Sequence, residues 1–274
     1  MVKIVVDSTA DLRPWCRDRV SVVHLTVNFG KEEYVDGVDL TPAAFYKKLE
    51  TSKDLPTTSQ AAPYAFGEVF EKIVEEGDEV VALVVSGALS GTCQSAMIAA
   101  ADYPGKVFVV DSRSIAIGLG ILAEYALTLV DKGLTAAEIA AEMEIVKEKV
   151  RLMAVVDTLE YLQRGGRVSK TVAIAGGMLS VKPIIALEEG SIKMAGKARG
   201  NKQANAQMDA MVMKQGIDYD RPAMLGYTGI SNELLCKYRA QSDIWTGDVY
   251  ESIVSGVVGT HAGPGAVAVA FFAK

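Results

Sequence analysis

The first half of the chain alternates short apolar, β-branched runs with longer stretches in which apolar residues recur at helical spacing. The expected strands cover residues 3–6, 20–27, 33–38, 79–85 and 107–110. The expected helices cover residues 42–49, 63–76, 90–101, 115–130 and 136–150. Strands separated by helices predict a parallel sheet that is covered by helices on both faces.

Polar residues follow three of these strands, at Asp7-Ser8, at residues 86–90 and at Asp111-Ser112. The carboxyl ends of parallel strands meet at one edge of a sheet, and ligands of open α/β sheets gather there. We therefore expect the functional site at this edge.

The second half has a different pattern. Its expected strands cover residues 152–156, 184–187, 191–194, 223–228, 248–254 and 266–272, and its expected helices cover 159–163, 202–215 and 232–242. Glu189-Gly190 separates two of the strands and indicates a hairpin. The prediction is an α/β protein with an N-terminal parallel-sheet domain flanked by helices, residues 1–150, and a C-terminal α+β domain with a mixed sheet, residues 151–274.

Composition narrows the possible functions. The formal net charge of −6 argues against broad binding to nucleic acid or to anionic membranes, both of which favour a basic excess. With two histidines, a histidine-rich metal site is not expected, while carboxylate-only Mg²⁺ sites remain open. Cys16, Cys93 and Cys236 are scattered and form no C-x-x-C pair, which indicates reduced thiols in a cytoplasm.

No targeting segment is visible. The first apolar run is short and ends at Asp7, so it does not resemble a secretory signal. The longest apolar region, residues 171–187, is interrupted by Gly176, Gly177, Lys182 and Pro183 and is not expected to span a bilayer. We expect a cytoplasmic protein without stable membrane insertion.

Residues 85–92 are a candidate anion site. A strand enters a glycine-bearing loop and a helix follows, with Ser90 expected as its N-cap and with the N–H groups of Gly91, Thr92 and Cys93 free to bind an anion. The alternative is simple capping by Ser90. No Gly-Lys-Ser/Thr follows the glycines, so the loop is not a P-loop.

Two further segments contain candidate ligand contacts. The three adjacent hydroxyls of residues 57–59 are suited to donate to a carboxylate, or to bond their own backbone in a turn. His261 lies in a glycine-rich stretch, residues 259–265, that is predicted as a loop allowing close approach to a ligand, although a structural role is as consistent with it. His24 falls in an apolar run and is predicted to be a core residue.

The basic residues form two clusters, Arg164 to Lys170 and Lys197 to Lys202, which contain Arg167 and Arg199. Guanidinium groups bind carboxylates and phosphates with two parallel hydrogen bonds. The alternative for each cluster is an ordinary solvated face.

Taken together, these segments resemble the DegV family. The resemblance rests on motifs that follow the family's order along nearly the whole chain: Asp7-Ser8-Thr9-Ala10-Asp11, Pro56-Thr57-Thr58-Ser59-Gln60, Leu89-Ser90-Gly91-Thr92, Val110-Asp111-Ser112, Tyr161-Leu162, residues 164–170, Gly259-Thr260-His261 and Gly263-Pro264-Gly265. It implies a bacterial fatty-acid-binding protein of two α/β domains that is not itself an enzyme and needs no cofactor. It also implies a partner, the catalytic subunit of a fatty acid kinase, which phosphorylates the bound acid to an acyl phosphate.

The resemblance also implies roles for individual residues. Thr58 and Ser90 match the family's carboxylate-binding hydroxyls, and His261 matches the histidine near the carboxylate. Arg167 and Arg199 match basic positions linked to the ligand head or to the kinase. The carboxylate-binding loops are then expected in residues 1–150, and the acyl pocket and basic loops in 151–274. One departure is that Cys93 stands where an aromatic residue often follows the Leu-Ser-Gly-Thr motif.

The chemistry of such a site is consistent with these residue types. About fourteen buried methylenes, at about 0.8 kcal/mol each, contribute roughly 11 kcal/mol before ordering costs. A carboxylate buried without partners costs several kcal/mol, which hydroxyls and a histidine would offset. The candidate wall residues are apolar and are divided between both halves of the chain: Leu83, Leu89, Ile115, Ile117, Leu119, Ile174, Met178, Leu179 and Ile184.

Two alternatives remain open at this stage. Ser90, His261 and either Asp7 or Asp111 are the residue types of a serine hydrolase of lipids or esters, although no G-x-S-x-G motif surrounds Ser90. A general lipid or small-acid sensor without a kinase partner is the second alternative. A nucleotide-dependent enzyme is disfavoured because neither a P-loop nor a G-x-G-x-x-G pattern is present.

Overall fold

The computed structural model describes residues 1–169, 180–247 and 249–274. Its strands are β1 (Val2–Asp7), β2 (Val20–Val23), β3 (Thr26–Phe29), β4 (Glu32–Val35), β5 (Thr57–Ser59), β6 (Glu79–Val84), β7 (Val107–Asp111), β8 (Val150–Val155), β9 (Val181–Glu188), β10 (Ser191–Arg199), β11 (Met224–Tyr227), β12 (Tyr250–Ile253) and β13 (Val267–Phe272). Its helices are α1 (Pro14–Arg17), α2 (Pro42–Thr51), α3 (Pro63–Glu75), α4 (Thr92–Ala100), α5 (Ala116–Asp131), α6 (Ala136–Val146), α7 (Glu160–Arg164), α8 (Gly200–Gln215), α9 (Glu233–Arg239) and α10 (Gly256–Ala262), with a 3₁₀ turn at Lys147–Lys149.

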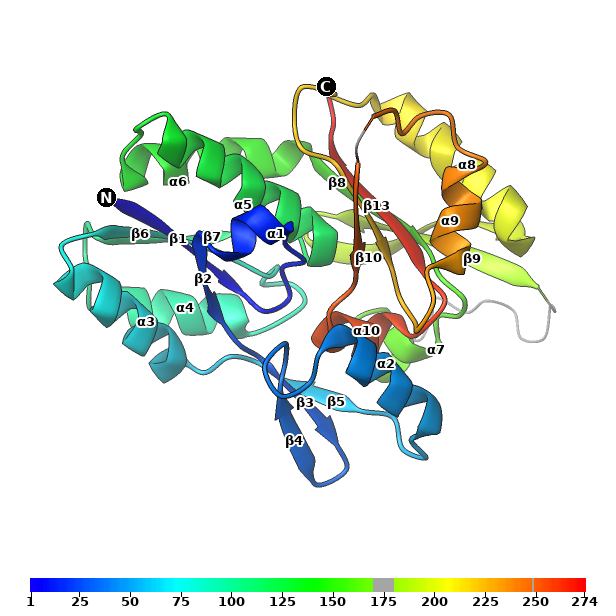
Figure 1. Cartoon of the computed structure of the whole chain (residues 1–274), viewed down its shortest axis with the longest axis horizontal. Helices are drawn as coiled ribbons and strands as arrows, with labels where there is room; N and C mark the ends of the chain where they lie inside the picture. Colours follow the sequence, from blue (N-terminus) through cyan, green and yellow to red (C-terminus); the bar gives the residue numbers. More distant parts are fainter. Residues whose placement is uncertain (170–179, 248) are drawn as a thin grey trace.

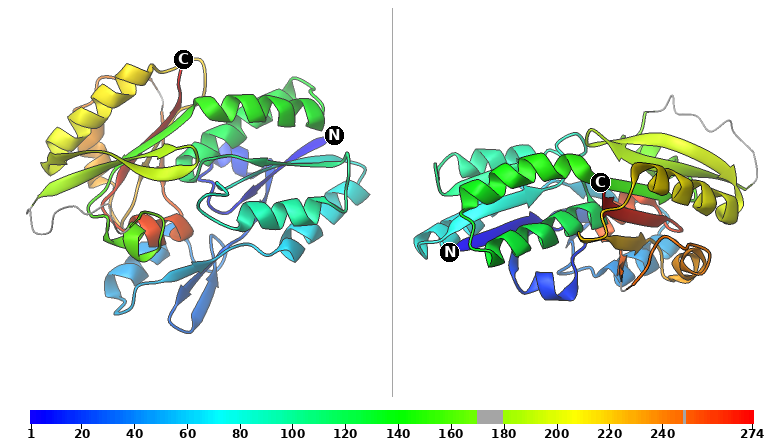
Figure 2. Two further views of the ribbon diagram at one scale, coloured as in Figure 1. Left: turned by 180° about the vertical axis from the view of Figure 1, so that it is seen from behind. Right: turned by 90° about the horizontal axis from the view of Figure 1, so that it is seen from above.

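The strands of the described residues form three sheets (Figures 1 and 2). A parallel sheet has the order β2-β1-β6-β7, a mixed sheet has the order β10-β9-β8-β13-β11-β12, and a small antiparallel sheet has the order β4-β3-β5. The predicted α/β class, with a parallel sheet first and a mixed sheet second, is confirmed.

Helices cover both faces of the parallel sheet, as its strand pattern predicts. Ile4 of β1 packs in a core with α5 and α6, whereas the next residue, Val5, packs in a core with α3 and α4. Successive side chains of a strand point to opposite faces, so a strand that is buried on both sides is apolar along its whole length. This explains the continuous apolar run in β6.

Side chains of the mixed sheet are divided between its two faces in the same way. Val155 of β8 packs in a core with helices α8 and α9. Its neighbour Ala154 packs on the other face, together with Ala266 and Ala268. The hairpin between β9 and β10 turns at Glu189 and Gly190, both with positive φ, which confirms the turn that the sequence predicts.

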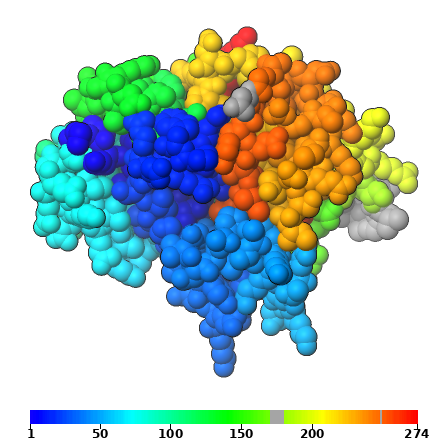
Figure 3. Space-filling model, in the orientation of Figure 1, coloured from blue at the N-terminus to red at the C-terminus, as the bar shows by residue number. Residues whose placement is uncertain are grey.

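The two ends of the chain share a core. Residues of the parallel sheet, such as Ile4 and Leu83, pack in one cluster with Met224, Ala270 and Phe272 of the mixed sheet. At the surface, Figure 3 shows segments from the start of the chain, in blue, lying against segments from near its end, in orange. The predicted domain boundary at residue 150 therefore stays a prediction.

Three local predictions differ from the structure. The run 20–27 is two strands, β2 and β3, separated at His24, which is half-buried and whose Nδ1 lies 2.7 Å from the Asp36 carbonyl oxygen. The hydroxyl-rich residues 57–59 form strand β5, paired with β3, and do not form a turn. His261 lies on helix α10 and not in a loop.

The glycines of α10 allow it to pack closely on α2. A Cβ on Gly259 would lie 2.5 Å from Tyr46 Oη and 2.7 Å from Phe45 Cε1. Close helix packing therefore accounts for this glycine, whereas the sequence predicts a loop that allows close approach to a ligand. Within the described residues, no helix combines the length and the apolar character that a bilayer crossing requires.

Gly259→Ala tests this packing. Because Phe45 and Tyr46 are fully buried, the added methyl group should cost about 1–3 kcal/mol of unfolding free energy. Gly67→Ala is the matched control, since a Cβ at Gly67 in α3 meets nothing within 4 Å and should stabilise the helix by about 1 kcal/mol. Urea denaturation measures both variants, and equal unfolding free energies would contradict the assignment.

Candidate functional site

A cavity of about 230 Å³ lies between the carboxyl edge of the parallel sheet and the inner face of the mixed sheet. This is the edge at which the sequence predicts a site. One wall comes from the first half of the chain through Val85, Leu89 and Ile115, and the other wall comes mainly from strands β8, β9, β10 and β13. The cavity is therefore built jointly by the two larger sheets.

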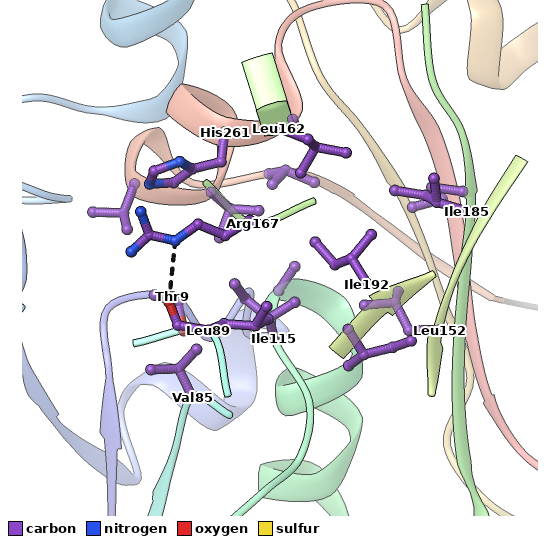
Figure 4. Close-up of a pocket in the computed structure, with 18 of the residues that line it drawn as sticks. Thr9, Val85, Leu89, Ile115, Leu152, Leu162, Arg167, Ile185, Ile192 and His261 are labelled. Atoms are coloured by element: carbon purple, nitrogen blue, oxygen red, sulfur yellow. Dashed lines mark hydrogen bonds between the residues drawn. The ribbon is translucent and has the colours of Figure 1, made fainter. Parts of the chain in front are cut away.

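The walls are largely apolar (Figure 4). Leu152, Ile185 and Ile192 lie together at the end of the cavity that is distant from His261. Small side chains on the inner face, including the cross-strand pair Ala154 and Ala268, keep the space open. A larger residue at either position would occupy the cavity.

Only some of the predicted wall residues line the cavity. Leu89 and Ile115 line the cavity, as predicted. The other candidates in the described residues lie in packed cores and not in the wall: Leu83, Ile117, Leu119 and Ile184. Ile174, Met178 and Leu179 lie outside the described residues. The neighbour of Ile184, Ile185, lines the cavity, and the two-residue alternation along β9 is the signal that would have identified it.

Four predicted site residues line the opposite, polar end. They are Thr58 on β5, Ser90 before α4, Arg167 after α7 and His261 on α10. Thr58 Oγ1 and His261 Nε2 are hydrogen-bonded at 2.8 Å. In Figure 4, Arg167 and His261 lie side by side at this end. Residues more than 200 positions apart in the chain thus form one polar cluster.

The prediction that Ser90 is the N-cap of α4 is wrong by one residue. The N-cap of α4 is Gly91, and Ser90 Oγ accepts a hydrogen bond from the N–H of Thr92 at 3.2 Å. Ser90 Oγ also lies 2.9 Å from Thr92 Oγ1. Gln60, which the sequence analysis missed as a wall residue, packs over Gly91, where a Cβ would lie 2.0 Å from its Oε1.

Arg167 places a cation at the polar end. Its Nε donates to the Leu89 carbonyl oxygen at 3.1 Å, and one terminal nitrogen donates to the Gly165 carbonyl oxygen at 2.7 Å. Among the described residues, no carboxylate forms an ion pair with it, and burial lowers the pKa of Arg167. The charge is therefore available to an anion in the cavity.

The structure does not bring Arg199 to this cluster. Arg199 is exposed, immediately before α8, and does not line the cavity. In the other basic cluster, Arg164 forms an exposed ion pair with Glu160 at 2.6 Å, and Lys170 lies outside the described residues. Only Arg167 of the predicted basic positions reaches the cavity within the described part of the chain.

Helix α10 positions His261, and two buried carboxylates hold its first turn. Asp11 Oδ1 accepts a hydrogen bond from the N–H of Ser255 at 3.0 Å, and Asp36 Oδ1 accepts one from Gly256 at 3.1 Å. Burial raises the pKa of Asp36 to about 6 and raises the pKa of Asp11 well above its usual value. The sequence analysis missed both residues, because their partners lie more than 200 positions away.

The imidazole of His261 is neutral at pH 7. Burial, and then the nearby charge of Arg167, lower the pKa of His261 to about 4. Its Nδ1 is buried and has no hydrogen-bond partner among the described residues. The backbone of Gly165 covers that side of the ring, since a Cβ there would lie 2.1 Å from Nδ1.

The geometry disfavours the serine hydrolase. Asp7 accepts hydrogen bonds from Thr9 and from the N–H of Val85, and Asp111 accepts them from the N–H groups of Gly87 and Arg113. These carboxylates shape the loops at the edge of the parallel sheet. His261 bonds Thr58 and not Ser90, so no Ser-His-Asp relay forms among the described residues.

Fold and site together define an α/β protein whose parallel and mixed sheets enclose an apolar cavity with a neutral histidine, hydroxyls and an arginine at one end. A family model described as uncharacterised protein, DegV family, matches residues 1–274. The chain is also 36% identical to a DegV domain-containing protein of Deinococcus radiodurans, over 98% of this chain and 97% of that protein. The chain belongs to the DegV family.

Solved structures of the family have the same fold. A fatty-acid-binding DegV family protein from Thermus thermophilus matches with a TM-score of 0.89 and 32% identity, over 100% of this chain and 99% of that one. A DegV family protein from Eubacterium eligens loaded with heptadecanoic acid matches with a TM-score of 0.87 and 27% identity, over the whole of both chains.

His261→Gln tests the protonation state of the site. Because the pKa of His261 is about 4 in the folded protein and the ordinary value of a histidine is 6.5, the unfolded state binds more protons between these values. The contribution of His261 to stability is thus present above pH 6.5 and is lost as the pH falls toward 4.

Urea denaturation at a series of pH values gives the readout. Between pH 7 and pH 4.5, the unfolding free energy of the unsubstituted protein should fall more than that of the His261→Gln variant. Parallel profiles over this range would show that the folded protein does not hold the imidazole neutral.

Proposed function

We propose that this protein binds one long-chain fatty acid, with the carboxylate at Thr58, Ser90 and His261 and the acyl chain between the two larger sheets. The proposal rests on the separation of polar and apolar side chains within one cavity. Hydroxyls, a histidine and an arginine line one end, and aliphatic side chains line the rest. The fatty acids bound by the Thermus and Eubacterium relatives support the same assignment.

The energetics match such a ligand. Each methylene that leaves water for an apolar cavity contributes about 0.8 kcal/mol. The carboxylate keeps its hydrogen bonds at the polar end, and Arg167 balances its charge without a competing carboxylate among the described residues. With its proton on Nε2, a neutral His261 donates to Thr58 Oγ1, which leaves the Thr58 hydroxyl hydrogen free to donate to the carboxylate.

We further propose that the protein presents the bound acid to the catalytic subunit of a fatty acid kinase in the cytoplasm. In that reaction a carboxylate oxygen attacks the terminal phosphorus of a nucleoside triphosphate, which yields an acyl phosphate and a nucleoside diphosphate. This chain needs no cofactor for the role, and the phosphoryl donor comes with the partner. Exposed Arg199 lies outside the cavity and is therefore available to a partner surface.

Thr58→Val and Ser90→Ala test the polar end. Each removes a hydroxyl at nearly constant shape and should weaken binding of a long-chain fatty acid by about 1–3 kcal/mol, or roughly five- to 150-fold in Kd. Thr57→Val is the matched control, because Thr57 is the exposed neighbour on the same strand and does not line the cavity. Native mass spectrometry and displacement of a fluorescent fatty acid measure occupancy and Kd. Occupancy that stays unchanged in both site variants would refute the placement of the carboxylate.

Arg199→Ala tests the presentation of the acid. The variant should keep its bound lipid and slow the formation of acyl phosphate by the kinase, with Lys197→Ala as the exposed basic control. Phosphorylation at the same rate as the unsubstituted protein would remove Arg199 from the docking surface. If the kinase does not phosphorylate the acid bound to this protein at all, the alternative function as a lipid sensor without a kinase partner is favoured.

A further inference from the structure

A second cavity of about 210 Å³ lies between α8, α9 and the adjoining ends of β8 and β13. Its lining combines apolar strand residues with polar helix residues: Val155, Asn201, Lys202, Asn205, Leu234, Lys237, Gln241, Gly265 and Val267. None of these residues lines the first cavity.

The two cavities lie back to back across the mixed sheet. Val155 and Val267 are cross-strand partners and face the second cavity. The next pair, Ala154 and Ala268, faces the first cavity. Because neighbouring residues of a strand point to opposite faces, a single layer of backbone separates the two spaces.

Asn205 is the informative residue of the second cavity. The residue is 5% exposed, it lines the cavity, and within the described part of the chain its side-chain amide forms no hydrogen bond. A buried amide without a partner is costly, and most buried polar groups in proteins have one. The Asn205 amide is therefore free to bond a ligand in the cavity, and its NH2 group can donate to an oxyanion.

The charges around Asn205 favour an anion. Lys202 and Lys237 line the cavity and no acidic side chain does, although Glu233 pairs with Lys237 at 2.6 Å from outside the lining. Helix α8 has sixteen residues, and its N-cap, Arg199, provides no side-chain cap. The N–H of Gly200 donates to the Ser180 carbonyl oxygen at 2.7 Å, and the next residues of the first turn, Asn201 and Lys202, bring their N–H groups and the positive end of the helix dipole to the same cavity.

We propose that this second cavity binds a phosphate group, either as free phosphate or as a small phosphate monoester. The donors approach from several directions: the first turn of α8, the amide of Asn205 and the ammonium groups of two lysines on different helices. Such an arrangement fits a multivalent oxyanion better than a planar carboxylate. The proposal does not depend on the identity of the ligand in the first cavity.

The test is calorimetric titration of the full chain with inorganic phosphate and, separately, with glycerol 3-phosphate, at constant ionic strength set with chloride. Saturable binding to the unsubstituted protein is expected. Tighter binding of glycerol 3-phosphate would identify a monoester as the ligand, and tighter binding of inorganic phosphate would identify the free ion. Absence of saturable binding for both would overturn the proposal.

Substitutions distinguish a specific phosphate site from nonspecific electrostatic attraction to lysines. Asn205→Leu should abolish saturable binding, and Lys202→Gln should weaken it about ten-fold, the loss of one charge-assisted hydrogen bond. Lys197→Gln, an exposed lysine outside the lining, should bind as the unsubstituted protein does. Equal weakening by Lys202→Gln and Lys197→Gln would overturn the proposal, even if Asn205→Leu does not fold. Lipid occupancy of the first cavity should be unchanged in the lysine variants, so failure here is distinguishable from failure of fatty acid binding.

Discussion

The site depends on the contact between the first turn of α10 and two buried carboxylates. The backbone N–H groups at the start of a helix have no partner within the helix, and the helix dipole favours negative charge there. Asp11 and Asp36 accept those hydrogen bonds from the early part of the chain. Without them, a seven-residue helix with two glycines would have little reason to stay helical, and His261 would have no fixed position.

Once α10 is in place, the cavity follows from simple geometry. The parallel sheet presents the ends of its strands, the mixed sheet presents alternate side chains, and α10 brings His261 to Thr58. The low pKa of His261 and the carboxylate-free surroundings of Arg167 in the described residues keep the polar end ready for an anion. The opposite face of β8 and β13 provides a second, separate space beside Asn205.

Sequence reasoning succeeded where a single element determines the outcome. The runs of β-branched residues predicted the strands, and Glu189-Gly190 predicted its hairpin because a two-residue turn needs positive φ. It failed where the outcome depends on packing against residues that are distant in the sequence. The glycines near His261 indicated a loop, whereas Gly259 allows a helix to pack against Phe45. Ile184 and Ile185 have the same propensity, and only the orientation of the sheet decides which one lines the cavity.

By itself, the sequence determined the fold class, the family resemblance and the residue types of the polar end, including Thr58, Ser90, Arg167 and His261. These depend on local periodicity and on motif order, which are properties of short segments. Only the tertiary structure decided that these four residues share one cavity, that Arg199 stands apart and that Asp11 and Asp36 hold α10. The physical reason is that burial, hydrogen bonding and pKa depend on groups hundreds of residues away, and chain position does not encode their proximity.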